Sequence, residues 1–590
     1  MFTFGIRKIH LTDGTAIEPP KSGMTVFTGP NNTGKSVLLR ELVTSVYVHP
    51  RTQEPQRWIT GVDLQRDGTG ADFISWLAGR GIVSRHNPRN SRHFLPNRFA
   101  TSDEDGVATD AAISNWETGH LGPIGHFLVQ DQWTEGRLSN QSDSRQWDWA
   151  KPPAHPSQLL WESMESLDRF SKLFEQAFGV SISINRYVPE IKLQLGSVSM
   201  PETPPPPPRE LRDAFAALPY LNEQGDGMRA FANILLTSLV RPTPVIAIDE
   251  PEAFLHPPQV RLLARHLTQY APPNCQVFVA THSADFLSGA LDGSAATSGS
   301  APRDLALVRI SRTTESQTAK TLTAASVREV LDTPLLRYSN IISGVFHDGV
   351  ILCEAEGDCQ FYEATTDVGR GDTPHDNLIF LHVNGKSRLS DAVRKLRACG
   401  VPTAAVADLD FLNDTQLIKK ALDHLGGDWS DIERDVTLVQ REASSTTITT
   451  IAREIKNQIN GIIQNPRGSE VLTKQQVDQI TDVLKTANGW KAIKKSGVRG
   501  FEGDVYNAAH RLITYFENLG LFLVPVGELE SWVPEVPRNK KAAWLTRVFA
   551  ERRHLQPSAD LQKFCADISG YLKAPNTFAE ISTDPGITAT

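Results

Sequence analysis

A glycine-rich loop between an apolar run and a helix-forming stretch constrains the fold of this chain more than any other feature. Residues 25–28 are β-branched or aromatic, residues 29–36 read GPNNTGKS, and residues 37–42 read VLLREL. The loop fits G-x-x-x-x-G-K-[ST] at every position and lies between a predicted strand and a predicted helix, as a phosphate-binding loop requires. An ordinary Gly/Asn turn is the alternative interpretation.

The chemistry of such a loop assigns roles to its residues. Glycines let successive backbone N–H groups point inward at an anion, and the helix start adds the positive end of its dipole. We expect Lys35 to reach the outer phosphates of ATP and the Ser36 hydroxyl to ligate Mg²⁺. The predicted nucleotide-binding residues are Gly29, Asn31, Asn32, Thr33, Gly34, Lys35 and Ser36.

Length, charge and cysteine usage bound the remaining possibilities. A chain of 590 residues exceeds a single core, so several domains are expected. The net charge of -8 argues against non-specific coating of nucleic acid but leaves a local basic groove open. The five cysteines never form C-x-x-C, which favours reduced thiols. We find neither a signal peptide core nor an apolar run of membrane-spanning length, so we expect a cytoplasmic protein without a membrane partner.

Two further strand-like runs end in residues suited to nucleotide hydrolysis. Residues 244–248 are apolar and lead into Asp249 and Glu250. We expect Asp249 to hold Mg²⁺ through water and Glu250 to orient or deprotonate the attacking water. Residues 277–280 form another buried strand, followed by His282, which is suited to contact the γ-phosphate across a dimer. A histidine that only completes a hydrogen-bond network is the alternative.

A glycine pair precedes the next predicted helix. Gly225 and Gly227 flank Asp226 and open an apolar helix, so the helix start is a second candidate anion site. Upstream, residues 50–157 show weak periodicity with one apolar run, residues 124–129, which we expect to be a strand. Residues 159–179 show helical periodicity.

Together these motifs resemble the ABC-type ATPase head of the OLD (overcoming lysogenization defect) proteins. The resemblance is carried by GPNNTGKS, the glycine-containing helix start, IDEPEAFLHP and ATHS, in this order. It implies that nucleotide is sandwiched between two heads, with Gly225 and Gly227 of one head reaching the γ-phosphate held by the other. It also implies a glutamine after an early strand that touches the metal and the attacking water, a role that either Gln130 or Gln132 could serve, with Gln130 taken as the predicted residue. A solvated strand end is the alternative interpretation of Gln130.

The second half of the chain places acids after predicted strands. The runs at residues 349–353, 379–383 and 403–407 are strand-like, and Glu354, Asp408 and Asp410 follow the first and third of them. The carboxyl ends of parallel strands are where sites form in an open α/β sheet. Hard oxygen ligands suit Mg²⁺ or Mn²⁺, and two such ions can bind the attacking and leaving oxygens of a phosphodiester. Ordinary loop acids are the alternative.

This half resembles a Toprim domain, the metal site shared by topoisomerases, primases and OLD-type nucleases. The resemblance implies that Glu354 acts as acid or base, and that Asp408 and Asp410 are its metal pair. The aspartate of the first loop and a late acid match Asp358 and Glu530, with Glu528 the second choice for the latter. A basic cluster of Lys491, Lys494, Lys495 and Arg499 supplies a lysine, with Lys495 the first choice, that is suited to balance charge on a scissile phosphate; a solvated helix end is the alternative.

The predicted architecture is α/β, with an ABC-type P-loop head followed by a Rossmann-like Toprim domain. We assign residues 1–320 to the ATPase, with an inserted arm or dimerisation region at about 50–200. Residues 321–345 are expected to be a connecting helix. Residues 346–535 are assigned to the Toprim domain, with a helical insertion at about 430–490, and residues 536–590 to a helical cap and tail.

The resemblance implies a function as well as a fold. It implies an ATPase and metal-dependent DNA endonuclease or nickase of bacterial antiviral defence, similar to Gabija-type nucleases, with nucleotide controlling cleavage. ATP and Mg²⁺ or Mn²⁺ are the implied cofactors, and DNA, a homodimer or higher homo-oligomer and an accessory defence protein the implied partners. One alternative is an ATPase sensor or scaffold that does not cut, motivated by Ala355, where the family has glycine, and by the acidic net charge. The other is an RNA nuclease acting on tRNA.

Overall fold

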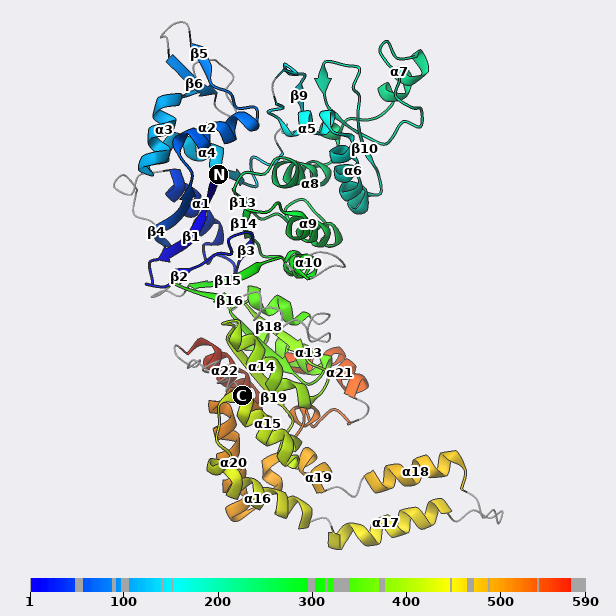
Figure 1. Ribbon diagram of the computed structural model, residues 1–590. Coiled ribbons are helices and arrows are strands. Elements are labelled where there is room, and N and C mark those ends of the chain that lie inside the picture. The colour runs from blue at the N-terminus through cyan, green and yellow to red at the C-terminus, as the bar shows by residue number, and fades with distance from the viewer. Residues whose placement is uncertain are drawn as a thin grey trace, which may run out of the picture. The chain divides into compact units, whose positions relative to one another are not determined.

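The computed structural model describes most of the chain as two compact units, residues 1–337 and 338–590. The described residues are 2–47, 57–87, 92–96, 106–138, 142–150, 152–295, 303–312, 317–322, 340–370, 377–445, 448–463, 472–485, 489–538 and 541–574. Figure 1 labels the helices and strands of both units.

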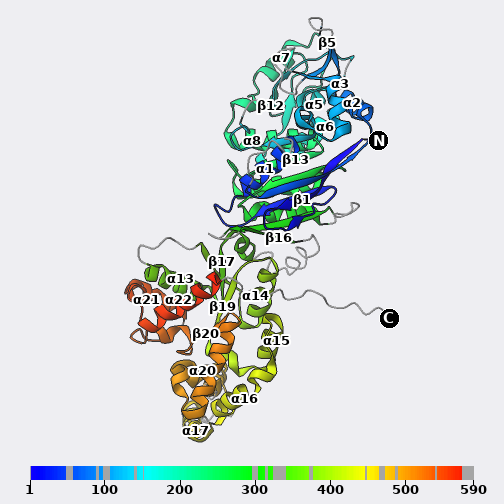
Figure 2. The same cartoon turned by 90° about the vertical axis from the view of Figure 1, so that its left-hand side faces the viewer.

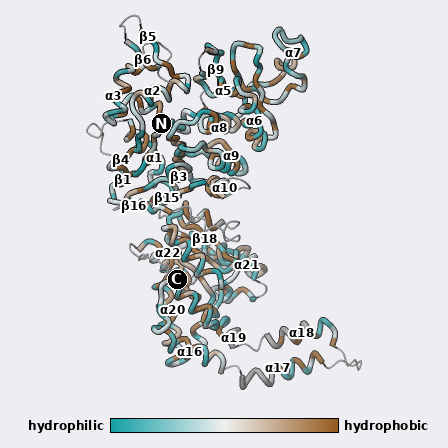
Figure 3. The backbone as a smooth tube through the Cα atoms, in the orientation of Figure 1, coloured by the Kyte–Doolittle hydropathy of each residue, from teal (hydrophilic) through white to brown (hydrophobic). Residues whose placement is uncertain are grey.

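A six-stranded sheet forms the centre of the first unit, in the order β16-β15-β3-β14-β13-β8. Its strands are β3 (Gly23–Thr28), β8 (Val129–Gln132), β13 (Val245–Asp249), β14 (Gln276–Ala280), β15 (Leu305–Arg312) and β16 (Gln317–Leu322). All neighbours are parallel except β15 and β16. Every residue of β3, β13 and β14 is buried, as expected for central parallel strands that are covered on both faces. Figure 3 shows the hydropathy of the described residues along the chain.

Helices follow these strands at the carboxyl end of the sheet. They include α1 (Lys35–Tyr47) after β3, α9 (Pro257–Tyr270) after β13 and α10 (Ala284–Ser294) after β14. Leu38, Leu39 and Leu42 of α1 are fully buried, which is the apolar face that the sequence period predicted. The fold around the phosphate loop is therefore the predicted strand–loop–helix.

A second sheet of the first unit was not predicted. It has the order β2-β1-β4, with β1 (Thr3–Leu11), β2 (Ala16–Ile17) and β4 (Ile59–Asp67). The expected irregular region at residues 50–157 instead contains β4, which pairs antiparallel with β1, and two helices, α2 (Gly70–Gly79) and α3 (Thr109–Thr118). The alternation of β4 is weak because most of its residues are only half-buried, so periodicity alone could not detect it.

The apolar run at residues 124–129 was predicted as a strand, and this prediction is wrong for most of the run. Residues Gly125–Leu128 form the short helix α4, and the strand β8 begins only at Val129. Gln130 therefore lies within the strand, and Gln132 is its last residue. A short apolar run has no period that separates helix from strand, which explains the error.

The remaining elements of the first unit are small. They are β5 (Arg85–Asn87), β6 (Arg92–Pro96), β7 (Gly106–Ala108), β9 (Ser144–Arg145), β10 (Ile182–Ile184), β11 (Glu190–Ile191), β12 (Leu193–Leu195), α5 (Pro156–Glu162), α6 (Met164–Phe178), α7 (Arg209–Ala216) and α8 (Asp226–Leu235). The single helix predicted at residues 159–179 is two helices. Ser163 ends α5 in an extended conformation and caps α6 by accepting from the backbone N–H of Ser166.

The second unit is built on a four-stranded parallel sheet in the order β18-β17-β19-β20. The strands are β17 (Gly349–Cys353), β18 (Leu378–His382), β19 (Thr403–Ala407) and β20 (Leu521–Leu523). Figure 2 shows α13 (Glu356–Arg370), α21 (Lys541–Ala550) and α22 (Ala559–Lys573) on one face, with α14 (Leu389–Ala398) and α15 (Thr415–Leu425) on the other. This is a three-layer α/β arrangement.

Helices fill the stretch between β19 and β20. Besides α15 they are α16 (Trp429–Ser445), α17 (Ile448–Ile463), α18 (Lys474–Lys485), α19 (Gly489–Ser496) and α20 (Gly503–Asn518). The connecting helix expected at residues 321–345 lies largely outside the described residues, as does the expected tail beyond residue 574. Thr321 and Leu322 belong to β16, and Asn340–Phe346 form a 3₁₀ helix, η5. Across the described ranges, no helix combines the length and apolarity that a bilayer-crossing segment needs.

Candidate functional site

The phosphate loop joins β3 to α1 and takes the backbone conformation that its glycines permit. Gly29 and Gly34 have φ of 140° and 96°. A Cβ on Gly29 would lie 2.1 Å from the Ile310 carbonyl oxygen, and one on Gly34 would lie 2.6 Å from the Trp58 indole nitrogen. Only glycine fits both positions, because a side chain would be strained by the dihedral and blocked by a neighbour.

Lys35 folds over its own loop. Its ammonium donates to the carbonyl oxygens of Gly29 and Pro30 at 2.9 and 2.8 Å. Burial lowers the pKa of Lys35 to about 8, and the nearby carboxylates of Glu252, Glu250 and Asp249 partly offset this effect. The ammonium therefore lies within the field of the acids at the neighbouring strand end.

The other predicted loop residues surround this lysine. Asn31 and Asn32 are exposed, and Asn32 has a positive φ of 61°. The Thr33 hydroxyl donates to the Pro30 carbonyl at 2.9 Å. The Ser36 hydroxyl donates to a carboxylate oxygen of Asp249 at 2.8 Å. The structure thus brings together Ser36 and Asp249, the two residues predicted to share a Mg²⁺ ion.

The acids after β13 are fixed by the end of β14. Glu250 has a positive φ of 48°, and its N–H donates to the Ala280 carbonyl at 2.8 Å. The His282 Nε2 atom lies 2.5 Å from the Glu250 carboxylate. Sequence reasoning missed Glu252, which accepts from the Thr281 hydroxyl at 2.8 Å and from the His282 N–H at 2.7 Å. Glu252 therefore orients the histidine that contacts Glu250.

The two glutamines lie next to these acids on β8. In the parallel pairing of β8 with β13, Gln130 is opposite Ile246 and Gln132 is opposite Ile248. Both side chains are buried. Gln132 is the residue nearer the carboxyl end of the strand, beside Asp249, whereas Gln130 lies two residues deeper in the sheet. The sequence pattern alone does not distinguish Gln130 from Gln132.

The glycines at the start of α8 have different surroundings. A Cβ on Gly227 would lie 2.7 Å from the Phe254 carbonyl oxygen, so this glycine allows α8 to pack on the loop after β13. A Cβ on Gly225 would meet nothing within 4 Å, and its φ of -58° is ordinary. A glycine at position 227 is thus needed for the packing of α8 on the loop after β13, whereas Gly225 has no neighbour that would exclude a side chain.

The acids of the second unit lie at the ends of β17 and β19, as predicted. A Glu354 carboxylate oxygen accepts from the Asp408 N–H at 3.3 Å, so the two strand ends meet. Burial and the charge of Asp408 raise the pKa of Glu354 to about 7. Asp358, in the first turn of α13, accepts from the Ala355 N–H at 3.1 Å. This hydrogen bond fixes the short turn from Glu354 to Asp358.

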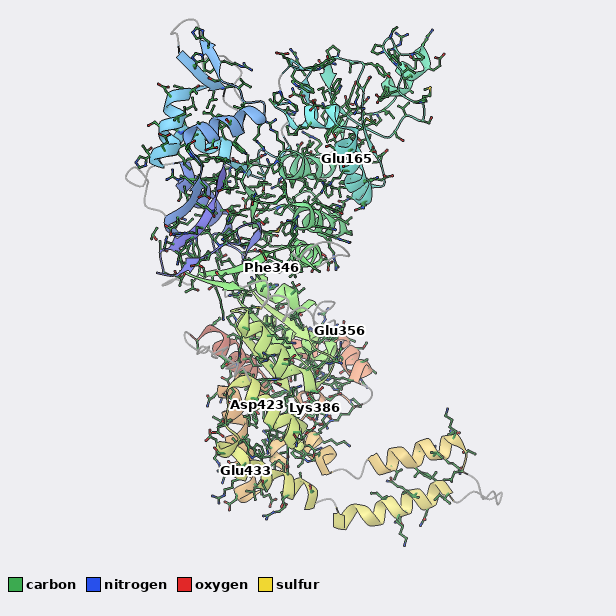
Figure 4. All side chains as sticks on the ribbon, in the orientation of Figure 1. Glu165, Phe346, Glu356, Lys386, Asp423 and Glu433 are labelled. Carbon is green, nitrogen blue, oxygen red and sulfur yellow. The ribbon has the colours of Figure 1, made fainter. Side chains whose placement is uncertain are left out.

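Lysines from distant parts of the chain neutralise the acids. The Lys494 ammonium lies 3.0 Å from Asp408 and 3.2 Å from Asp410. Lys386, which Figure 4 labels, lies 3.3 Å from Asp410, and Lys541 lies 2.6 Å from Asp358. Burial raises the pKa of Asp408 despite Lys494. Burial alone would lower the pKa of Lys494, but Asp408 and Asp410 raise it well above its usual value.

Lys494, rather than the predicted Lys495, is the lysine of α19 that contacts the aspartates. Lys495 is exposed, and its backbone carbonyl accepts from Arg538 at 3.1 Å. Its neighbour Lys494 contacts the aspartates instead. Adjacent residues of a helix point about 100° apart, so the rotation of α19 decides which lysine faces the acids. Sequence spacing does not supply this rotation.

The late acids also face this cluster. Glu528 lies 3.3 Å from Arg538, and burial together with the charge of Glu530 raises the pKa of Glu528. Glu530 in turn contributes to raising the pKa of Lys541. Glu530 and Glu528 therefore both lie within electrostatic reach of the groups around Asp408.

The carboxylate oxygens of these acids are the kind of ligand that Mg²⁺ or Mn²⁺ prefers, but the side chains stand too far apart to ligate one ion together. Within the described ranges, no three Asp, Glu, His or Cys side chains stand close enough together to ligate one metal ion. Burial and the charges of Asp408 and Asp410 raise the pKa of Glu354, and the Lys494 ammonium supplies a positive charge between the two aspartates. A metal ion held by Asp408 and Asp410 would compete with this ammonium for their carboxylate oxygens.

Two family models match parts of the chain. Residues 183–288 match a model described as "AAA domain, putative AbiEii toxin, Type IV TA system". This range includes Gly225, Asp249, Glu250 and His282. Residues 345–410 match the TOPRIM domain of overcoming lysogenization defect protein-like chains, a range that includes Glu354, Asp358, Asp408 and Asp410. The chain therefore carries a P-loop ATPase domain followed by an OLD-like TOPRIM domain, as predicted.

A curated relative and solved structures give weaker likenesses. The Old nuclease of Escherichia phage P2 is 27% identical over 174 residues, which span 29% of this chain and 29% of that protein. An Smc head domain from Pyrococcus furiosus is 10% identical, covering 56% of this chain and 99% of that one, with a TM-score of 0.31. An SMC head domain from Thermotoga maritima is 9% identical, covering 54% and 98%, with a TM-score of 0.26. TM-scores this low say nothing about activity.

Proposed function

We propose that this ATPase–TOPRIM chain hydrolyses ATP and cuts or nicks DNA in a metal-dependent reaction that nucleotide controls. The observation that carries the proposal is the presence of two separate acid-bearing strand ends. The first has a phosphate loop beside it, at Lys35 and Ser36. At the second, Lys386 and Lys494 pair with the aspartates Asp408 and Asp410, next to Glu354.

The first unit supplies the groups that ATP hydrolysis needs. Lys35 would hold the outer phosphates, and Ser36 with Asp249 would hold Mg²⁺, which their contact of 2.8 Å supports. Glu250, paired with His282, would orient the attacking water. The open position of Gly225 supports a homodimer or higher homo-oligomer in which this glycine completes the nucleotide site of another copy.

The second unit supplies the groups for phosphodiester cleavage. Asp358, Asp408, Asp410, Glu354 and Glu530 would hold Mg²⁺ or Mn²⁺, which supplies charge neutralisation and an acidic bound water when present. Glu354, with its pKa of about 7, is suited to give or take a proton near neutral pH. A metal ion held by Asp408 and Asp410 would supply the positive charge that Lys494 supplies in their pairing. The Lys494 ammonium would then be available to contact the scissile phosphate, the role predicted from the sequence for Lys495.

A plasmid assay tests the proposal. Purified protein is incubated with supercoiled plasmid and Mg²⁺ or Mn²⁺, with and without ATP, while phosphate release is followed in parallel. We expect nicked or linear product with metal and a change in its rate with ATP. Absence of cleavage with both metals, alongside intact ATP hydrolysis, would refute the nuclease. Cleavage of RNA but not DNA would replace DNA with an RNA substrate such as tRNA.

The proposed setting is bacterial antiviral defence in the cytoplasm, together with an accessory defence protein. The matches to an OLD-like TOPRIM domain and to an AAA domain of a toxin–antitoxin system support this setting. Phage plating on cells that express the wild-type chain should fall relative to cells that express Asp408→Ala. Equal plating across a panel of phages would count against a defence role.

The second candidate function is an ATPase sensor or scaffold that does not cut. The observation that favours it is the neutralisation of Asp358, Asp408 and Asp410 by Lys541, Lys494 and Lys386. The same plasmid assay separates the two candidates, because a scaffold shows ATP turnover without cleavage under any metal.

A further inference from the structure

Arg137 is a fully buried arginine directly beside the acids of the ATPase site. It follows β8, and its side chain has an exposed fraction of 0%. The guanidinium donates to the backbone carbonyl oxygens of Glu250 at 2.9 Å, of Gln132 at 3.2 Å, and of Asp249. One side chain thus joins the ends of the two neighbouring strands β8 and β13.

The charge of this arginine is retained in the interior. Burial lowers the pKa of Arg137 to about 10, and the carboxylates of Glu252, Asp249 and Glu250 partly offset this effect. The guanidinium is therefore protonated at neutral pH. Burying a charge is unfavourable unless dipoles and opposite charges compensate, and here the carbonyl dipoles and the acids of the nucleotide site do so. The compensation ties the arginine to the groups that would act on ATP.

The backbone of Glu250 requires such support. Its φ of 48° is in the left-handed region, which is unfavourable for a residue with a side chain. Three contacts hold it there: its N–H donates to the Ala280 carbonyl, its carbonyl accepts from Arg137, and its carboxylate meets His282. Strained conformations persist at functional sites when the surroundings determine them from several sides.

The other side of the Arg137 segment contacts α8. The Arg137 carbonyl accepts from the Asn233 amide at 2.8 Å, and the Leu138 carbonyl accepts from Arg229. The Thr134 hydroxyl of the same segment donates to the Asp249 carbonyl at 3.2 Å. A continuous series of hydrogen bonds therefore runs from α8, whose start carries Gly225, to the backbone of Asp249 and Glu250.

We propose that Arg137 is a positioning residue for ATP hydrolysis, which sets the backbone of Asp249 and Glu250 and makes their placement depend on the position of α8. The role rests on the proposed ATP hydrolysis. It assigns to Arg137 no contact with nucleotide, so its loss should affect turnover rather than binding.

The first test replaces the buried guanidinium with a smaller cation. In Arg137→Lys a single ammonium cannot reach three carbonyl oxygens. We expect the stoichiometry of ATP binding and its Kd to stay within about threefold of wild type, whereas kcat falls by about 10- to 100-fold because the acids are misplaced. KM should change little.

Arg241→Lys is the matched control. Arg241 is also a buried arginine of the first unit, and it donates to the backbone carbonyl oxygens of Pro153 and Arg80. It precedes β13, at the strand end opposite Asp249. The control should lower the melting temperature as Arg137→Lys does and leave kcat near wild type, which separates positioning from general destabilisation.

A second variant tests the connection to α8 without touching the buried charge. Asn233→Ala removes the amide that donates to the Arg137 carbonyl. We expect a several-fold loss of kcat with ATP binding intact, and no further loss when it is combined with Arg137→Lys, because both changes break one series of contacts. This variant carries the test if Arg137→Lys does not fold.

Two results would overturn the role of Arg137. One is wild-type kcat in both folded variants, and the other is a loss of ATP binding in proportion to the loss of turnover. A wild-type chain that binds ATP but never hydrolyses it would refute the proposed hydrolysis itself, and the role of Arg137 with it. This pattern is visible before any variant is made.

Discussion

The side chain of Lys35 lies over the phosphate loop that precedes it. Its ammonium already makes two hydrogen bonds to loop carbonyls, at Gly29 and Pro30, so its position is fixed over the loop. Its surroundings are predicted from a local motif, because all the groups that position it lie within seven residues along the chain.

Replacing this lysine should abolish ATP binding and leave the fold intact. In Lys35→Ala the charge-assisted contacts to phosphate are lost, each worth about 1.5–3 kcal/mol, so Kd for ATP should rise by roughly 100-fold or more. Calorimetric titration measures the affinity and circular dichroism the fold. Undiminished affinity in the folded variant would refute the assignment of the loop.

Glu354 gives the second unit a dependence on pH. Its pKa of about 7 lies above the ordinary value of 4.5, so the folded protein holds a proton that the unfolded chain has released between those values. Stability should therefore fall as the pH rises from about 5 to 8, by up to about 3 kcal/mol for this group. Metal must be chelated in the experiment, since a bound ion would favour the carboxylate.

The Glu354→Gln variant should show a flatter decline of unfolding free energy over that pH range. Glutamine imitates the protonated carboxyl and can still accept from the Asp408 N–H. Glu356→Gln is the matched control, because Glu356 is an exposed glutamate two residues further along. Urea unfolding at each pH gives the comparison. Equal slopes for wild type and Glu354→Gln would show that Glu354 is already ionised below pH 7.

At the scale of elements, the start of α8 offers a contrast between two glycines. Gly227 is packed against the Phe254 carbonyl, whereas Gly225 is open. Gly227→Ala forces a Cβ into backbone and should destabilise the first unit by about 1–3 kcal/mol. Gly225→Ala should leave the melting temperature unchanged.

The order is reversed for the part of ATP turnover that depends on a second copy of the chain, where Gly225→Ala should have the larger effect. We expect Gly225→Ala to reduce the protein-concentration-dependent part of the ATPase rate, because the methyl group would enter the proposed contact with the partner's nucleotide. Sedimentation with a non-hydrolysable ATP analogue reports the association. A Gly225→Ala chain that associates and turns over ATP like wild type would remove this glycine from the interface.

The elements also show what sequence could and could not predict. The strands before Asp249, Glu354 and Asp408 were predictable because each is a short apolar run that ends in acids. The pairing of β4 with β1 and the division into α5 and α6 were not, because the first depends on a distant partner and the second on a cap at Ser163. Lys541 is far from Asp358 along the chain, so no local pattern marks it. Lys494 belongs to the basic cluster seen in the sequence, but only the rotation of α19 distinguishes it from Lys495.

At the scale of the whole molecule, two sites lie in two compact units of one chain. Asp408→Ala should therefore abolish plasmid cleavage and leave ATP hydrolysis within about twofold of wild type, since substitutions in separate compact units that share no partner act independently. Parallel phosphate-release and gel assays on one preparation measure both. Continued cutting by this variant would mean that the metal site lies elsewhere.

The ammonium of Lys494 between Asp408 and Asp410 affects how tightly the site can bind metal ions in the cell. A tethered competitor cannot be diluted away, so its local concentration is the same at every protein concentration. Metal ions must outcompete it, and their binding is weakened by a constant factor. Such a site therefore binds metal only at a higher free-ion concentration than the two aspartates alone would need. Below that concentration, Asp408 and Asp410 remain paired with Lys494 and their charge is balanced without an ion.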